Sequence, residues 1–191
     1  DVGMIQADAL GVDEEGTLNC LKALDRSLPQ RLDQETAWLA KQKTPVLVVG
    51  DIPPSAAVLA ERLGAPLVWM GNFGWDDIYE PLGGLFAEFA AAAKAQYAQG
   101  ELLLRCPFSL PMDWGLKEQE LDVTVSALRE LPSQWRHYLE QIHQPLVLVG
   151  FGGLGVAIDP ALFRLWPNHH FLMPGPAAPQ LREQLQSEIN V

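Results

Sequence analysis

Cysteine is scarce in this sequence of 191 residues, which contains only Cys20 and Cys106. Two isolated cysteines are too few for a disulfide framework or a structural zinc site, so we expect buried free thiols. Long apolar runs are also missing, since no stretch reaches the ~20 residues that a membrane-spanning helix needs. A basic and then apolar signal segment is not seen at the start. These absences predict a soluble, cytoplasmic protein without a membrane span.

Positive charge is the second deficit. The chain has 13 Lys and Arg against 24 Asp and Glu, which gives a formal net charge of -11. Nucleic acids and anionic membrane surfaces would repel such a protein at long range, so neither is expected as a partner. The four histidines form no spacing typical of a metal site, and no G-x-S-x-G motif occurs. We therefore predict no metal and no serine-hydrolase site.

Short apolar runs separated by helical patterns dominate what is present. The run 46–49 lies between Pro45 and Gly50, and a second run follows at 66–70. Such uninterrupted runs are typical of strands buried on both faces of a parallel sheet. The segment between them begins with two prolines, is rich in alanine and leucine, and stops at Gly64, which predicts a helix. Strand, helix and strand with short connections predict an α/β fold with Rossmann-like parallel sheets.

The remaining sequence extends this pattern and then interrupts it. Helices are expected within 27–43 and 83–99, and a strand within 101–106. From Ser109 the composition changes to prolines and charges, and an apolar run restarts the strand pattern at 145. We predict a first Rossmann-like domain over 1–112, a connector over 113–144 and the start of a second domain over 145–191.

A glycine-rich stretch follows the run that begins at 145, and it is the first candidate for binding. Such a loop at a strand end presents backbone N–H groups to a phosphate, or it simply makes a tight turn, and the residues leave both alternatives open. The spacing also fits G-x-G-x-x-G, but the following residues begin a helix poorly and no acidic residue ends a strand about 20 positions later. A dinucleotide-dependent oxidoreductase is therefore the least favoured hypothesis. The candidate phosphate-side residues are Gly152, Gly153 and Gly155.

Polar and aromatic residues follow the first two predicted strands, at the sheet edge where open α/β folds bind ligands. Asp51 comes directly after the first, and the stretch NFGWDDIYE comes after the second. The candidate binding residues are Asp51, Asn72, Trp75, Asp76 and Tyr79.

The same residues have a structural alternative. Asp51 would cap the helix that starts at Pro53, while Asn72 and Asp76 would cap the next helix and the aromatic rings would pack between sheet and helix. From the residues alone, capping and packing are slightly favoured over binding. Asp76 and Asp77 would point to different sides of an extended segment, so they are not interpreted as a catalytic pair.

Three segments in order resemble a known family. QADALGVD, VVGDIPPSAAVLAERLGAPLVWMGNFGWDDIYE and LLRCPFSLPM are similar to the glycosyltransferase-like region at the amino end of plant-type L-arabinokinases and of related bacterial proteins. The family patterns are D-x-x-P, N-F-S-W-D-x-I-Y and R-x-P…P-M, and Gly74 replaces the expected Ser. The likeness covers most of the chain.

The resemblance implies a fragment of a two-domain GT-B architecture, with the acceptor side first and the nucleotide-sugar side second. It implies transfer of a sugar from a nucleotide-sugar donor to a sugar acceptor, with no metal and no further cofactor. In this interpretation Asp51, Asn72, Trp75, Asp76 and Tyr79 face the acceptor, and the three glycines line the phosphate side. The chain would be inactive alone, because the catalytic residues would lie outside it. The alternative is a non-catalytic module that binds a sugar nucleotide for regulation. The oligomeric state has no signal in the sequence.

Overall fold

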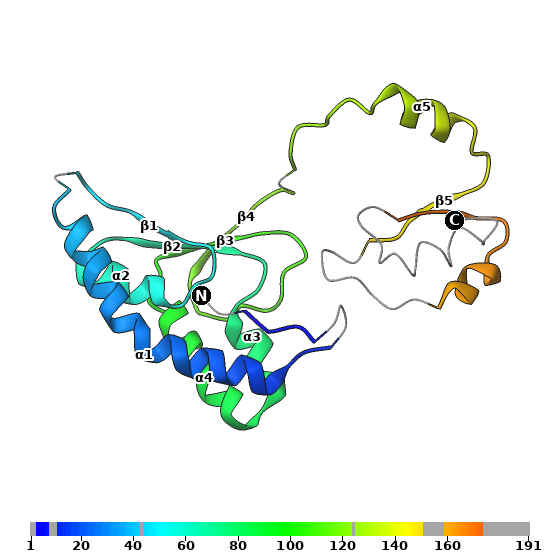
Figure 1. Cartoon of the computed structure of the whole chain (residues 1–191). Helices are drawn as coiled ribbons and strands as arrows, with labels where there is room; N and C mark the ends of the chain where they lie inside the picture. Colours follow the sequence, from blue (N-terminus) through cyan, green and yellow to red (C-terminus); the bar gives the residue numbers. More distant parts are fainter. Residues whose placement is uncertain (1–2, 8–10, 43, 124, 151–158, 174–191) are drawn as a thin grey trace. The chain divides into compact units, whose positions relative to one another are not determined.

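The computed structural model describes residues 3–7, 11–42, 44–123, 125–150 and 159–173 (Figure 1). The chain divides into two compact units. The first comprises Asp1–Gly3 and Glu14–Val125, and the second comprises Met4–Asp13 and Ser126–Val191. The division after Val125 falls inside the segment that the sequence predicts to be a connector. Each unit is described by itself.

The first unit contains a four-stranded parallel sheet in the order β1-β2-β3-β4. The strands are β1 (Val48–Gly50), β2 (Leu67–Gly71), β3 (Leu102–Arg105) and β4 (Lys117–Glu120). The predicted α/β, Rossmann-like fold class is confirmed. β4 lies in the expected connector and was not predicted as a strand, because all four of its residues are exposed and an edge strand of this kind has no apolar run to mark it.

Four α-helices accompany the sheet: α1 (Glu14–Leu39), α2 (Ser55–Leu63), α3 (Trp75–Tyr79) and α4 (Gly84–Tyr97). A short 3-10 helix, η1 (Glu80–Leu82), joins the last two. α1 begins well before residue 27, the predicted start, and continues through Pro29. α2 ends at Gly64 as predicted, since this residue takes the left-handed conformation at φ 58°.

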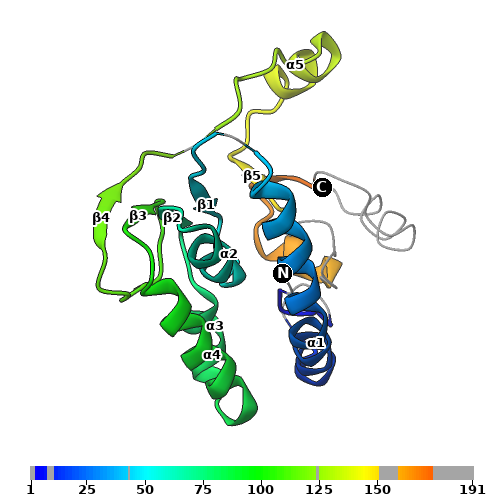
Figure 2. The same ribbon diagram turned by 90° about the vertical axis from the view of Figure 1, so that its left-hand side faces the viewer.

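One face of the sheet carries the core. Trp69 is fully buried there, with its ring edge-on to Tyr97 at 5.0 Å and its Nε1–H donating to the Tyr97 carbonyl at 2.9 Å. Leu67 and Leu103 from the same face meet alanines of α2 and α4 in this cluster. Figure 2 shows α2 and α4 on the same side of the strands. Because alternate residues of a strand point to opposite faces, Val49 belongs to the other face, where it is 54% exposed.

The second unit contains a pair of parallel strands. β5 (Leu146–Leu148) pairs with β6 (His170–Leu172), and the unit also contains α5 (Ser133–Glu140) and the 3-10 helix η2 (Pro160–Leu165). Phe163 and Phe171 pack edge-to-face at 4.9 Å as its small core. The apolar run that restarts at 145 therefore forms a strand. In the described parts of the chain, no helix combines the length and the apolarity needed to cross a membrane.

Candidate functional site

The candidate site lies at the carboxyl edge of the four-stranded sheet. Asp51, Asn72 and Cys106 directly follow β1, β2 and β3, so three neighbouring strands deliver them to the same edge. A groove of about 340 Å³ lies there, and we call it the edge groove. Its lining residues are Asp51, Met70, Gly71, Asn72, Cys106, Pro107, Phe108 and Val123. Open α/β sheets bind ligands at this edge, so its position favours a binding role.

The crossing loop, residues 106–116, connects β3 to β4 and forms one wall of the edge groove. It contains no helix, yet it carries Met112 and Trp114 into the core, where they are 0% and 5% exposed. The Trp114 ring stacks on Tyr97 with ring centres 4.1 Å apart and an angle of 18°. The crossing loop therefore contributes two side chains to the core, whereas the connections from β1 to β2 and from β2 to β3 contain helices.

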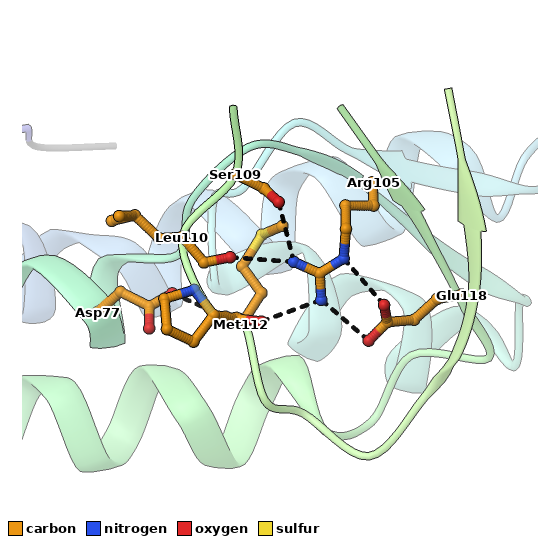
Figure 3. A network of polar contacts seen from close by, with 7 residues as sticks. Asp77, Arg105, Ser109, Leu110, Met112 and Glu118 are labelled. Atoms are coloured by element: carbon orange, nitrogen blue, oxygen red, sulfur yellow. Dashed lines mark hydrogen bonds and ion pairs between the residues drawn. The ribbon is translucent and has the colours of Figure 1, made fainter. Parts of the chain in front are cut away.

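Arg105, the last residue of β3, holds the crossing loop in place (Figure 3). Its Nε and Nη2 donate to the Glu118 carboxylate of β4 at 2.8 and 3.0 Å. Nη1 donates to the Ser109 hydroxyl at 3.1 Å and to the Leu110 carbonyl at 2.9 Å, and Nη2 also donates to the Pro111 carbonyl at 2.9 Å. The hydrogen bonds between the two side chains raise the pKa of Arg105 and lower the pKa of Glu118. The guanidinium group can make all of these bonds at once because it is planar and carries five N–H donors in a fixed arrangement.

The two acidic residues of α3 also bind the crossing loop. Asp76 accepts a hydrogen bond from Trp114 Nε1 at 3.0 Å, and Asp77 accepts one from the Met112 backbone N–H at 3.1 Å. Asp76 is only 4% exposed, and this burial raises its pKa even though the bond from Trp114 lowers it. The two carboxylates thus have different partners in the same loop, and they belong to a helix rather than to the extended segment that the sequence analysis considered. Asp77 thus links the stretch NFGWDDIYE to the stretch RCPFSLPM at Met112, and Asp76 links it to Trp114 two residues further on.

Gly74 starts α3 in a place without room for a side chain. A Cβ there would lie 2.2 Å from Asp76 Oδ1 and 2.5 Å from Trp114 Cζ2. Both distances are shorter than real Cβ contacts, so the close approach of α3 and the crossing loop depends on glycine. The departure from the expected Ser at this position therefore has a structural reason in this chain.

Trp75 and Tyr79 lie away from the edge groove. Their rings stack with centres 5.3 Å apart, and both line a separate cavity of about 100 Å³ between α1, α2 and α4. Tyr79 is 3% exposed, and burial raises its pKa to about 12. Of the five candidate acceptor-side residues, the structure brings Asp51 and Asn72 together in the edge groove, whereas Asp76 is buried beside Trp114.

The capping alternative finds no side-chain bond at the starts of α2 and α3. Pro54 precedes α2 and Gly74 precedes α3, and neither start has a side-chain cap. Asp51 and Asn72 are instead exposed at the sheet edge. Their exposure leaves the carboxylate and the amide available to a ligand.

Sequence reasoning missed Phe108 and the role of Arg105. The segment RCPFSLPM was recognised only through a family resemblance, and nothing in it marks Phe108 as exposed or Arg105 as the anchor of a loop. The three candidate phosphate-side glycines, Gly152, Gly153 and Gly155, lie outside the described residues. In the part of the chain that is described, no group of three His, Cys, Asp or Glu side chains could hold a metal ion.

The chain is similar to the L-arabinokinase of Arabidopsis thaliana. The two are 30% identical over 170 residues, which is 80% of this chain and 15% of the relative. The chain therefore spans about 15% of the length of that protein. The predicted resemblance to L-arabinokinases is confirmed as a distant similarity, and the glycosyltransferase-like character of the matching region stays a prediction. No family model and no solved structure matches the chain.

Proposed function

We propose that the first unit is the acceptor-side part of a GT-B glycosyltransferase-like protein, which transfers a sugar from a nucleotide-sugar donor when intact. The edge groove is the observation that carries this proposal. It places an exposed carboxylate, Asp51, and an exposed amide, Asn72, at the edge where parallel α/β sheets bind their ligands. The similarity to L-arabinokinase supports a carbohydrate as the ligand, because that name refers to a sugar substrate.

The donor side of the proposed protein belongs to the second unit. The sequence after β5 is rich in glycine, and the resemblance assigns the donor phosphates to Gly152, Gly153 and Gly155. Backbone N–H groups would then stabilise the departing diphosphate without a metal ion. Neither unit would be active alone, because transfer needs the donor and the acceptor to be held together.

A non-catalytic sugar-nucleotide-binding module is the second candidate function. It is favoured by the chemistry of the edge groove, whose lining, among the residues that the structure describes, has a single carboxylate and contains no histidine, lysine or arginine. Such a groove offers hydrogen bonds to a sugar but few groups for proton transfer. Turnover distinguishes the two candidates.

The test is a titration of the intact protein with UDP-, GDP- and TDP-sugars, with tryptophan fluorescence and release of free nucleotide measured together. Saturable binding with nucleotide release is the result expected for a transferase. Saturable binding without release supports the regulatory module. A folded protein that binds none of these donors contradicts both candidates.

A further inference from the structure

Phe108 is the most exposed aromatic side chain of the described residues, with 93% of its surface accessible. It lies in the crossing loop and lines the edge groove together with Asp51 and Asn72. Folding normally buries a phenyl ring because apolar surface is unfavourable in water. The position of Phe108 therefore contributes little to the core, whose aromatic members are Trp69, Tyr97 and Trp114.

The backbone at Phe108 is strained as well. Its φ is 59°, in the left-handed region that residues with a bulky side chain rarely adopt. Strained positions of this kind persist only where the surrounding structure holds them, and they gather at ligand sites.

Hydrogen bonds hold the strained backbone at Phe108 on both sides of this residue in the chain. Before Phe108, the Cys106 N–H donates to the Gly71 carbonyl at 2.8 Å, and after it the Leu110 N–H donates to the Asn72 carbonyl at 2.8 Å. Arg105 then binds the Ser109 hydroxyl and two carbonyls of the loop, as Figure 3 shows. The loop around the exposed ring is thus fixed by hydrogen bonds within the protein.

We propose that Phe108 is the platform on which an uncharged sugar ring stacks in the edge groove, with Asp51 and Asn72 binding the sugar hydroxyls. This inference deepens the proposed function and rests on its assignment of a carbohydrate to the groove. A sugar has apolar C–H faces and a rim of hydroxyls, which match an aromatic ring beside a carboxylate and an amide. A platform that is already in place also reduces the entropy lost on binding.

The charge of the groove selects the neutral sugar. Asp51 is the charged residue of the described lining, and no Lys, Arg or His of the described residues lines the groove with it. A phosphorylated sugar would bring a negative charge close to this carboxylate, and like charges repel. The groove therefore takes the neutral acceptor and excludes the phosphate groups of the donor.

The binding test uses the full chain, isothermal titration calorimetry and a panel of neutral aldopentoses and aldohexoses, together with their 1-phosphates. We expect saturable binding of at least one neutral sugar and at least tenfold weaker binding of its 1-phosphate. Phe108→Leu should weaken the neutral sugar at least tenfold. Trp38→Leu is the matched control, because Trp38 is an exposed aromatic of α1 that does not line the groove, and it should leave binding unchanged.

Phe108→Gly separates binding from folding. Glycine adopts φ 59° without strain, so this variant should unfold at the same or a higher temperature and still lose sugar binding. A fall in melting temperature would show that the ring has a structural role and would overturn the proposal. Absence of binding by every neutral sugar, equal binding by Phe108→Leu, or preference for the 1-phosphate would also overturn it.

The two proposals fail in different ways. If donors are turned over by a Phe108→Leu variant with an unchanged acceptor KM, the transferase stands and the platform is wrong. If neutral sugars bind through Phe108 but no nucleotide sugar binds, the platform stands and the transferase is wrong.

Discussion

The hydroxyl of Tyr97 donates a hydrogen bond to the carbonyl of Ile52 at 2.7 Å. The same hydroxyl accepts a bond from the Trp75 backbone N–H at 3.2 Å. One side chain at the end of α4 thus joins the segment after β1 to the start of α3. Ile52 has a φ of 57°, which is unusual for a β-branched residue, and the bond from Tyr97 helps to hold it. The carboxyl edge therefore depends on a residue of α4 that is itself fully buried.

Tyr97→Phe tests this connection. The variant keeps the ring that stacks on Trp114 but removes both hydrogen bonds of the hydroxyl. We expect the free energy of unfolding to fall by about 1–3 kcal/mol, the usual cost of leaving buried polar groups without partners. Urea denaturation measures the loss. Tyr138→Phe is the control, because that hydroxyl is exposed and binds His170 at 3.1 Å, and a similar loss there would contradict the argument.

Gly74→Ala tests the close contact between α3 and the crossing loop. The added Cβ would collide with Asp76 and Trp114, so we expect a loss of about 1–3 kcal/mol, as for other overpacked sites. Thermal unfolding followed by circular dichroism measures it. The control is Gly150→Ala, whose Cβ meets nothing within 4 Å, and this variant should change stability by less than about 0.5 kcal/mol. Full stability of Gly74→Ala would show that the contact relaxes freely.

Arg105→Lys tests the anchor of the crossing loop. An ammonium group cannot reproduce five directed bonds of a planar fork, so the loop should open more often and the free energy of unfolding should fall by about 1–2 kcal/mol. Hydrogen exchange at the Cys106 and Leu110 amides, which bind Gly71 and Asn72, should become faster. Arg62→Lys affects one exposed ion pair with Asp33 and should have little effect. Unchanged exchange in Arg105→Lys would contradict an anchoring role.

The buried carboxyl of Asp76 predicts a pH dependence of stability. Its pKa in the folded protein is raised above the ordinary 3.8 by burial, so the folded state holds the proton more tightly than the unfolded state. The stabilisation is complete below pH 3.8 and is lost as the pH rises through the raised pKa. Each unit of pKa difference corresponds to about 1.4 kcal/mol.

Asp76→Asn isolates this contribution. The amide oxygen still accepts from Trp114, but the side chain no longer titrates, so the variant should lose less stability than the unchanged protein as the pH rises above about 4. Urea denaturation at a series of pH values compares the two curves. Parallel curves would show that Asp76 does not titrate in this range.

Local sequence accounts for the central strands and most of the helices. Runs such as 46–49, bounded by proline and glycine, have few alternatives to a buried strand, because their backbone and side chains both need partners in the interior. Alanine-rich segments and Gly64 similarly indicate helices and their ends. Polar β4 and the early start of α1 escaped prediction, since neither has a continuous apolar run.

Short stretches of sequence are enough to predict the α/β class and to place Asp51 and Asn72 at strand ends, because the apolar runs that precede these residues need burial and backbone partners. Which of the side chains beyond those strand ends reach the edge groove, and which are buried elsewhere, follows only from the tertiary structure. It turned Trp75 and Tyr79 toward a cavity between helices, buried Asp76 against Trp114 and left Phe108 exposed beside the edge groove. These outcomes depend on hydrogen bonds and packing between residues more than 20 positions apart, such as Tyr97 with Ile52 and Asp76 with Trp114. No local pattern encodes contacts over that separation.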